Sequence, residues 1–124
     1  MLNYIFVFIG GGLGAVSRFG VGNIFNRFLI AEFPVATLIS NSFSCIIMGL
    51  VLYFSSNMKV INEEVKLFLI VGFCGGFSTF STFSLETLNL LKSGHNVIAL
   101  VNVVLSIVIC LVILYILMQK QKVA

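Results

Sequence analysis

The sequence is poor in charged residues, and this scarcity excludes most soluble folds. Only 9% of its 124 residues are charged, whereas a soluble domain of this size has about 25%. Aspartate and tryptophan are absent, and proline and histidine occur once each. The chain therefore has no candidate set of His, Asp and Cys for catalysis. Its net charge of +3 lies mostly in loops and does not suggest a nucleic-acid surface. We expect neither an enzyme nor a nucleic-acid-binding protein.

Cysteine is also scarce and scattered. Cys45, Cys74 and Cys110 fall in three different apolar runs, without the close spacing of metal ligands. Buried free cysteine usually behaves as a small apolar residue. We interpret all three as packing residues.

Long uncharged runs make up most of the chain, of which 60% is hydrophobic. No Asp, Glu, Lys or Arg occurs in residues 1–17, 33–58, 67–85 or 93–119. A bilayer core about 30 Å thick requires roughly 20 helical residues to cross it. The sequence therefore predicts an all-α membrane protein, a single domain over residues 1–124, with four transmembrane helices at about 2–22, 34–54, 65–91 and 96–118.

Basic residues are almost evenly divided between the two sides of the membrane. Four spans put both termini on one side, with Lys59, Lys66, Lys120 and Lys122; the other side has Arg18, Arg27 and Lys92. Orientation follows this bias, which here is four against three. Either helper factors set a weak topology, or copies insert in both orientations and pair head to tail. Four packed helices fill their own centre, so a transport role predicts an oligomer, most simply a two-fold dimer.

The third apolar run contains the most informative motif, from Gly72 to Ser84. Paired glycines followed by Ser and Thr in mid-membrane predict a broken helix, whose freed backbone groups line a cavity or hold an ion. Carbonyl groups at Gly75 and Ser78 could coordinate a small hard cation such as sodium. The alternative is a kinked helix whose hydroxyl groups satisfy the backbone locally.

Aromatic and polar residues mark one face of three predicted spans. Phe80 and Phe83 lie about 60° apart around a helix, so their rings share a face and could present positive edges to an anion. Two polar stripes accompany them: Thr37, Asn41 and Ser44 in the second span, beside Ser40, and Asn102, Ser106 and Cys110 in the fourth. They suggest a shared, narrow, uncharged path, although packing phenylalanines and interhelical hydrogen bonds explain each feature taken singly.

Three stretches of the chain form a set. The first is Gly10-Gly-Gly-Leu-Gly-Ala-Val-Ser-Arg18, the second is Pro34-Val-Ala-Thr-Leu-Ile-Ser-Asn41, and the most specific is Gly75-Gly-Phe-Ser-Thr-Phe-Ser-Thr-Phe-Ser-Leu-Glu86. Together they resemble the CrcB or Fluc family of fluoride channels, over essentially the whole chain. The resemblance implies a dual-topology antiparallel homodimer in the bacterial inner membrane, with two narrow pores and a structural sodium ion at its centre.

The resemblance also assigns roles by position. Asn41, Phe80 and Phe83 match residues of the fluoride pathway, and Gly75 and Ser78 match those whose carbonyl groups hold the sodium. Six more residues are candidates for the pathway or for structural support: Arg18, Thr37, Ser81, Thr82, Glu86 and Ser106. From the residues alone, mutual pairing or capping of a neighbouring helix explains Arg18 and Glu86 equally well.

The chain departs from the family pattern at a few positions. Ala36 and Ser44 stand where glycine is common, and Ser78 where threonine is frequent. Cys110 and Leu114 replace hydroxyl residues of the fourth span. These last two changes put the polar side of the path in question.

The implied activity is a passive leak that lets fluoride out of the cytoplasm down its electrochemical gradient and protects the cell from fluoride toxicity. The main alternative is a four-span multidrug exporter, which needs a carboxylate in the middle of its first span; this chain has none there. Another is an accessory subunit held together by its glycine and asparagine faces, which would not need the motif at 75–84.

Overall fold

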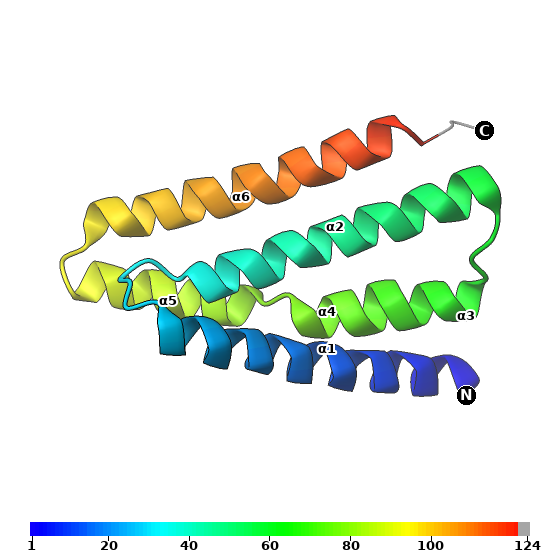
Figure 1. Ribbon diagram of the computed structural model, residues 1–124, viewed down its shortest axis with the longest axis horizontal. Coiled ribbons are helices and arrows are strands. Elements are labelled where there is room, and N and C mark those ends of the chain that lie inside the picture. The colour runs from blue at the N-terminus through cyan, green and yellow to red at the C-terminus, as the bar shows by residue number, and fades with distance from the viewer. Residues whose placement is uncertain (122–124) are drawn as a thin grey trace.

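The protein is a bundle of four long helical segments in a computed structural model that describes residues 1–121 (Figure 1). Four segments are long and apolar enough to cross a membrane. They are Leu2–Phe28, Val35–Met58, Glu63–Lys92 and Asn96–Gln119. The prediction of an all-α protein with four spans is confirmed. Lys122, which we counted among the basic residues on the side of the termini, lies outside the described residues.

Three of the spans are single helices, and the third is composed of several. The single helices are α1 (Leu2–Phe28), α2 (Val35–Met58) and α6 (Asn96–Gln119). The third span consists of α3 (Glu63–Lys66), the π-helix η1 (Leu67–Cys74), α4 (Gly75–Phe77) and α5 (Phe80–Lys92).

The starts and ends of these helices are set by individual residues with turn or capping conformations. Lys59 has a left-handed φ of 49° directly after α2, and Asn62 Oδ1 accepts a hydrogen bond from the Val65 amide at the start of α3. Gly94, with φ of 83°, turns the chain between α5 and α6. The connections between spans are consequently short, and consecutive spans run antiparallel (Figure 1).

Glycines let α1 approach the third span closely. A Cβ atom at Gly14 would overlap the carbonyl of Phe73, and one at Gly10 would overlap that of Phe68. From the other side, Gly76 faces the carbonyl of Gly11 with the same lack of room. The four-residue spacing of Gly10 and Gly14 therefore forms a backbone-to-backbone contact of the kind that small residues permit between membrane helices.

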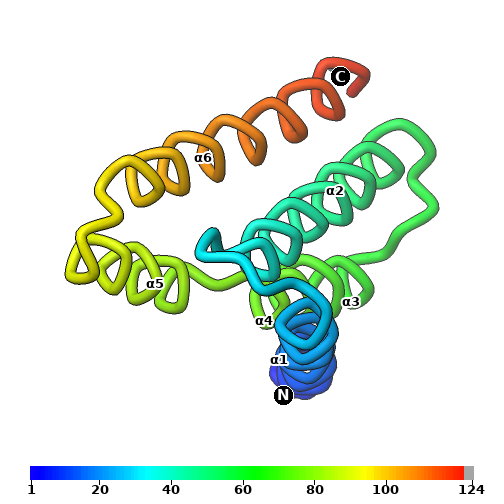
Figure 2. The backbone as a smooth tube through the Cα atoms, turned by 60° about the vertical axis from the view of Figure 1, so that its left-hand side comes forward, coloured from blue at the N-terminus to red at the C-terminus, as the bar shows by residue number. Residues whose placement is uncertain are grey.

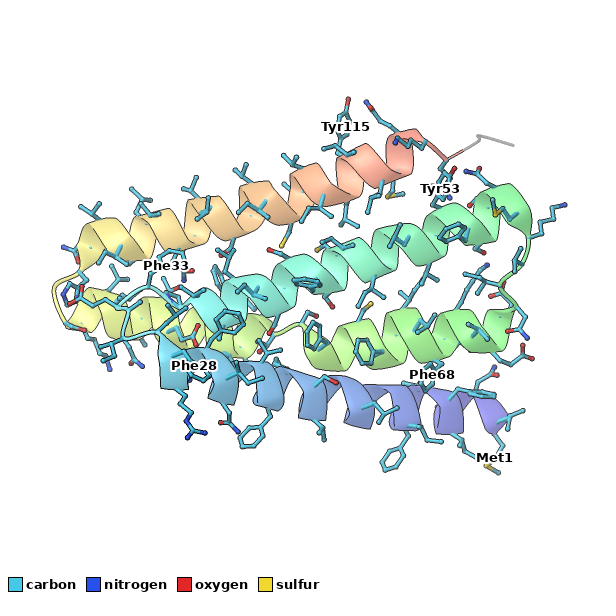
Figure 3. The ribbon with its side chains drawn as sticks, in the orientation of Figure 1. Met1, Phe28, Phe33, Tyr53, Phe68 and Tyr115 are labelled. Atoms are coloured by element: carbon cyan, nitrogen blue, oxygen red, sulfur yellow. The ribbon has the colours of Figure 1, made fainter. Side chains whose placement is uncertain are left out.

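The other side of the bundle is formed by α2 and α6, which lie side by side (Figures 1 and 2). Gly49 of α2 receives the side chain of Leu117 from α6. Few large apolar residues are buried, and most point outward, as Tyr115 does from α6 (Figure 3). An apolar exterior over a small core is the arrangement expected when lipid replaces water around the helices.

Candidate functional site

The helix of the third span is interrupted at two residues. Ser78 (φ −79°, ψ 161°) and Thr79 (φ −154°, ψ 120°) are both extended, between α4 and α5. The paired glycines that suggested the interruption are themselves helical, in α4. These glycines matter because they have no side chain. Gly76 packs closely on α1, whereas a Cβ at Gly75 would meet no atom within 4 Å.

Asn41 satisfies the backbone at the interruption. Its Oδ1 accepts a hydrogen bond from the Thr79 amide at 2.8 Å, and its Nδ2 donates to the Thr79 carbonyl at 3.3 Å. In an unbroken helix the Thr79 amide would donate to the carbonyl of Gly75. A side-chain amide has two N–H groups, so this arrangement leaves one of them on Asn41 for another acceptor.

Other polar side chains cap the two ends that the interruption creates. The hydroxyls of Ser44 and Ser78 donate to the Cys74 carbonyl at 2.8 and 2.7 Å, and Arg18 Nε donates to the Gly76 carbonyl at 3.1 Å. On the other side, Thr79 Oγ1 accepts from the Thr82 amide at 3.1 Å, as an N-cap of α5. Arg18 thus caps a neighbouring helix, one of the two structural roles considered for it.

A groove of about 300 Å³ opens beside the interruption. It collects predicted pathway residues from three spans, together with Ser78, and its complete lining is Asn41, Cys45, Ser78, Thr79, Phe80, Phe83, Ser106, Ile107 and Cys110. The rings of Phe80 and Phe83 have centroids 5.8 Å apart and are inclined at 42°. Phe80 is 80% exposed, so one side of the groove is open in the single chain.

A second cavity, of about 240 Å³, lies on the α1 side of the interruption and is lined by charged and hydroxyl groups. Arg18, Thr37, Thr82 and Glu86 all contribute to it, and Thr79 lines both this cavity and the groove. Glu86 Oε1 accepts from the Thr37 hydroxyl at 2.9 Å, while Oε2 is buried with no hydrogen-bond partner within residues 1–121. No ion pair joins Arg18 to Glu86 in the described part of the chain.

A third cavity, of about 350 Å³, continues from the second toward the loops. The two share Asn26, Pro34 and Glu86 in their linings. At this end, His95 Nε2 lies 3.2 Å from Glu32 Oε1, which joins the loop after α1 to the turn before α6. The three cavities therefore lie next to one another, with Glu86 lining the second and third cavities and Thr79 lining both the second cavity and the groove.

The polar stripe of α6 is connected to α5. Asn102 Nδ2 donates to the hydroxyl of Thr87 at 2.9 Å, and the hydroxyl of Ser106 donates to Asn102 Oδ1 at 3.4 Å. The Thr87 hydroxyl in turn donates to the Phe83 carbonyl at 2.8 Å. This chain of bonds holds α6 against the helix that carries the two phenylalanines.

Comparison with known proteins places the chain in a family. The family described as "CrcB-like protein, Camphor Resistance (CrcB)" matches residues 5–118. The chain belongs to this family.

Three relatives show how closely the chain follows the family. One from Ruminiclostridium cellulolyticum is 43% identical over 90% of this chain and 85% of its own length. One from Magnetococcus marinus is 41% identical over 88% and 89%, and one from Coxiella burnetii is 37% identical over 89% and 90%. All three are named "Fluoride-specific ion channel FluC". The resemblance inferred from the motifs is confirmed, and the chain is a multi-pass bacterial membrane protein.

The structure does not gather every candidate residue in the groove. Ser81 is exposed and shares a hydrogen bond with Thr79 Oγ1 at 3.3 Å, and Gly75 faces open space. Of the two departures noted in the fourth span, Cys110 lines the groove and Leu114 does not.

Cys45 and Ile107 line the groove, although the sequence analysis interpreted Cys45 as a packing residue and did not consider Ile107. The signal for Cys45 was available, because it lies four residues after Asn41 and so on the same helical face. We interpreted it as packing because buried free cysteine usually behaves as a small apolar residue.

Proposed function

We propose that this protein is a fluoride-selective channel that lets fluoride leave the cytoplasm passively. One observation carries the proposal: the groove brings Asn41, Phe80 and Phe83 together next to an interrupted helix. The names of its relatives, fluoride-specific ion channels, support the same function. The role is transport without catalysis, driven by the electrochemical gradient.

The lining of the groove suits a small anion. The edges of aromatic rings carry partial positive charge, and the second N–H of Asn41 is a hydrogen-bond donor. The lining contains no charged side chain. A few weak partners offer enough attraction for entry without trapping the ion. Ser106, with its hydroxyl in the lining, provides a further polar contact from α6.

The second and third cavities provide the approach to the groove in this proposal. Arg18 and the hydroxyls of Thr37 and Thr82 supply donors along the way, and Glu86 stands where the two cavities meet. A cation near the entrance raises the local concentration of an anion. Arg18, whose Nε caps Gly76, keeps its other N–H groups for this role.

A second copy of the chain completes the path. The exposed ring of Phe80 and the open side of the groove would be covered by an antiparallel partner, which gives a homodimer with two pores. The nearly balanced basic residues support insertion in both orientations. The same dimer would lie in the bacterial inner membrane, surrounded by lipid.

We further propose a structural sodium ion at the dimer centre, held by the carbonyl groups of Gly75 and Ser78. Two observations agree with this site: the Thr79 amide, the usual partner of the Gly75 carbonyl, donates to Asn41 instead, and Gly75 borders open space. Backbone carbonyls are ligands that a hard cation accepts. When bound, sodium would neutralise carbonyl dipoles that converge from two chains.

Fluoride efflux from liposomes tests the proposed function. Purified protein is reconstituted with internal potassium fluoride, an ionophore releases the counter-ion, and an electrode records fluoride; matched vesicles contain chloride. We expect rapid fluoride release and no chloride release. Fluoride release no faster than from empty liposomes would contradict a channel, and equal chloride release would contradict selectivity.

A further inference from the structure

Two thiols from different spans line the same groove. Cys45 comes from α2 and Cys110 from α6, and both line the groove with Asn41, Phe80 and Phe83. The two spans that carry them pack against each other. Both side chains are partly accessible, whereas the third cysteine, Cys74, is buried and lies outside the lining.

The kind of ligand follows from the number of donors. Sulfur is a soft ligand that selects soft cations. Among residues 1–121 no group of three or more His, Cys, Asp or Glu residues could hold a metal, so the four-ligand environment that structural zinc requires is not offered here. Two thiols that line one groove suit a cation that binds two ligands in a linear arrangement, as monovalent copper and silver do.

We propose that Cys45 and Cys110 bind one soft monovalent cation of the Cu(I) and Ag(I) class, and that its binding closes the groove to fluoride. The blocking part rests on the proposed function. The balance is two R–SH plus M⁺ giving [RS–M–SR]⁻ plus two H⁺. Two S–H bonds break, two S–M bonds form, and no electron is transferred.

The complex would oppose fluoride in two ways. It fills space between α2 and α6 at the level of the phenylalanine pair, and it carries a net negative charge where an anion has to pass. Like charges in a medium of low dielectric constant repel strongly. A soft cation would therefore block the path. Fluoride is a hard anion with no affinity for thiols, so it would not compete for the same site.

Silver is the probe, because silver fluoride is soluble and silver needs no reductant. Purified protein in chloride-free buffer is titrated with silver nitrate, and bound silver per chain is measured by dialysis and elemental analysis. Fluoride efflux is recorded on the same preparation. We expect one tightly bound silver ion per chain and loss of fluoride efflux as that site fills.

Three variants separate the site from other thiols. Cys45→Ser and Cys110→Ser should each lose the tight silver site, and the efflux of each variant, measured first without silver, should not fall when silver is added. Cys74→Ala, which removes a thiol outside the lining, should bind silver and be blocked as the parent is. Elution as a single species on gel filtration checks that each variant is folded.

The outcomes are distinct. Equal inhibition of the Cys45→Ser/Cys110→Ser double variant, or silver binding without inhibition, would overturn the proposal. Absence of fluoride efflux before silver is added would refute the proposed channel instead, while the silver titration would still report on the thiol pair.

Discussion

At the scale of single residues, Asn41 has two tasks at once. Its amide closes the interruption through two hydrogen bonds to Thr79, and the same side chain lines the groove. A buried backbone group left without a partner costs about 1–3 kcal/mol. A residue that lines the groove therefore also stabilises the interrupted form of the third span.

Asn41→Asp should abolish fluoride efflux. A carboxylate cannot donate to the Thr79 carbonyl, and it places a negative charge in the groove. Efflux from liposomes measures the effect. Asn3→Asp, the same change at an exposed position near the start of α1, should leave efflux as in the parent. Normal flux in Asn41→Asp would place the path elsewhere.

Replacing either groove phenylalanine should lower fluoride efflux without disturbing assembly. Phe80→Ile and Phe83→Ile keep the apolar surface but remove the positive ring edge that an anion contacts. Efflux and gel filtration are measured together. Phe8→Ile is the matched control, since Phe8 is 81% exposed on α1, outside all three cavities. If both groove variants conduct like the parent, the rings do not line the path.

At the scale of helical elements, the contact between α1 and the third span positions the interruption. Gly10, Gly14 and Gly76 bring two backbones together, and this approach allows Arg18 to reach the Gly76 carbonyl. Protein interiors do not adjust freely to added volume. A larger residue at one of these glycines should therefore change the shape of the groove, although none of the three lines it.

Gly14→Ala should destabilise the protein by about 1–3 kcal/mol, because the new methyl group would overlap the Phe73 carbonyl. Thermal unfolding in detergent measures the difference. Gly20→Ala, in the same helix with no atom within 4 Å of the added Cβ, should be neutral or slightly stabilising, since alanine favours helix. Equal stability of the two variants would contradict a close contact at Gly14.

At the scale of the whole molecule, the single chain leaves one side of the groove uncovered. The groove is open on the side of Phe80, and the lining comes from α2, the third span and α6. An antiparallel partner would cover it without altering any bond within the chain. In the proposed dimer, mixed insertion would make such a partner available, and the sequence favours it through a difference of only one basic residue, four against three.

Adding one lysine should therefore shift the orientation of the whole molecule. Val60 is 74% exposed in the loop after α2, so Val60→Lys raises the bias to five against three, toward cytoplasmic termini. Reporter fusions at the C-terminus, one active in the cytoplasm and one outside, should both work in the parent and only the first in the variant. Val60→Gln controls for polarity. A parent with a single orientation would exclude dual topology.

Hydropathy and motif order alone determined four spans, the family and most of the lining residues, because apolar run length and residue spacing are local properties. Asn41, Phe80 and Phe83 were assigned to the fluoride pathway together because the motifs that contain them resemble the family, whereas spacing alone left their roles open. Only the tertiary structure decided that Ser78 and Thr79, rather than the glycines, leave the helix, that Asn41 bonds to Thr79, and that Cys45 and Cys110 line the same groove. These facts depend on which faces of separate spans meet, and small differences in packing settle that choice without leaving a periodic signal in the chain.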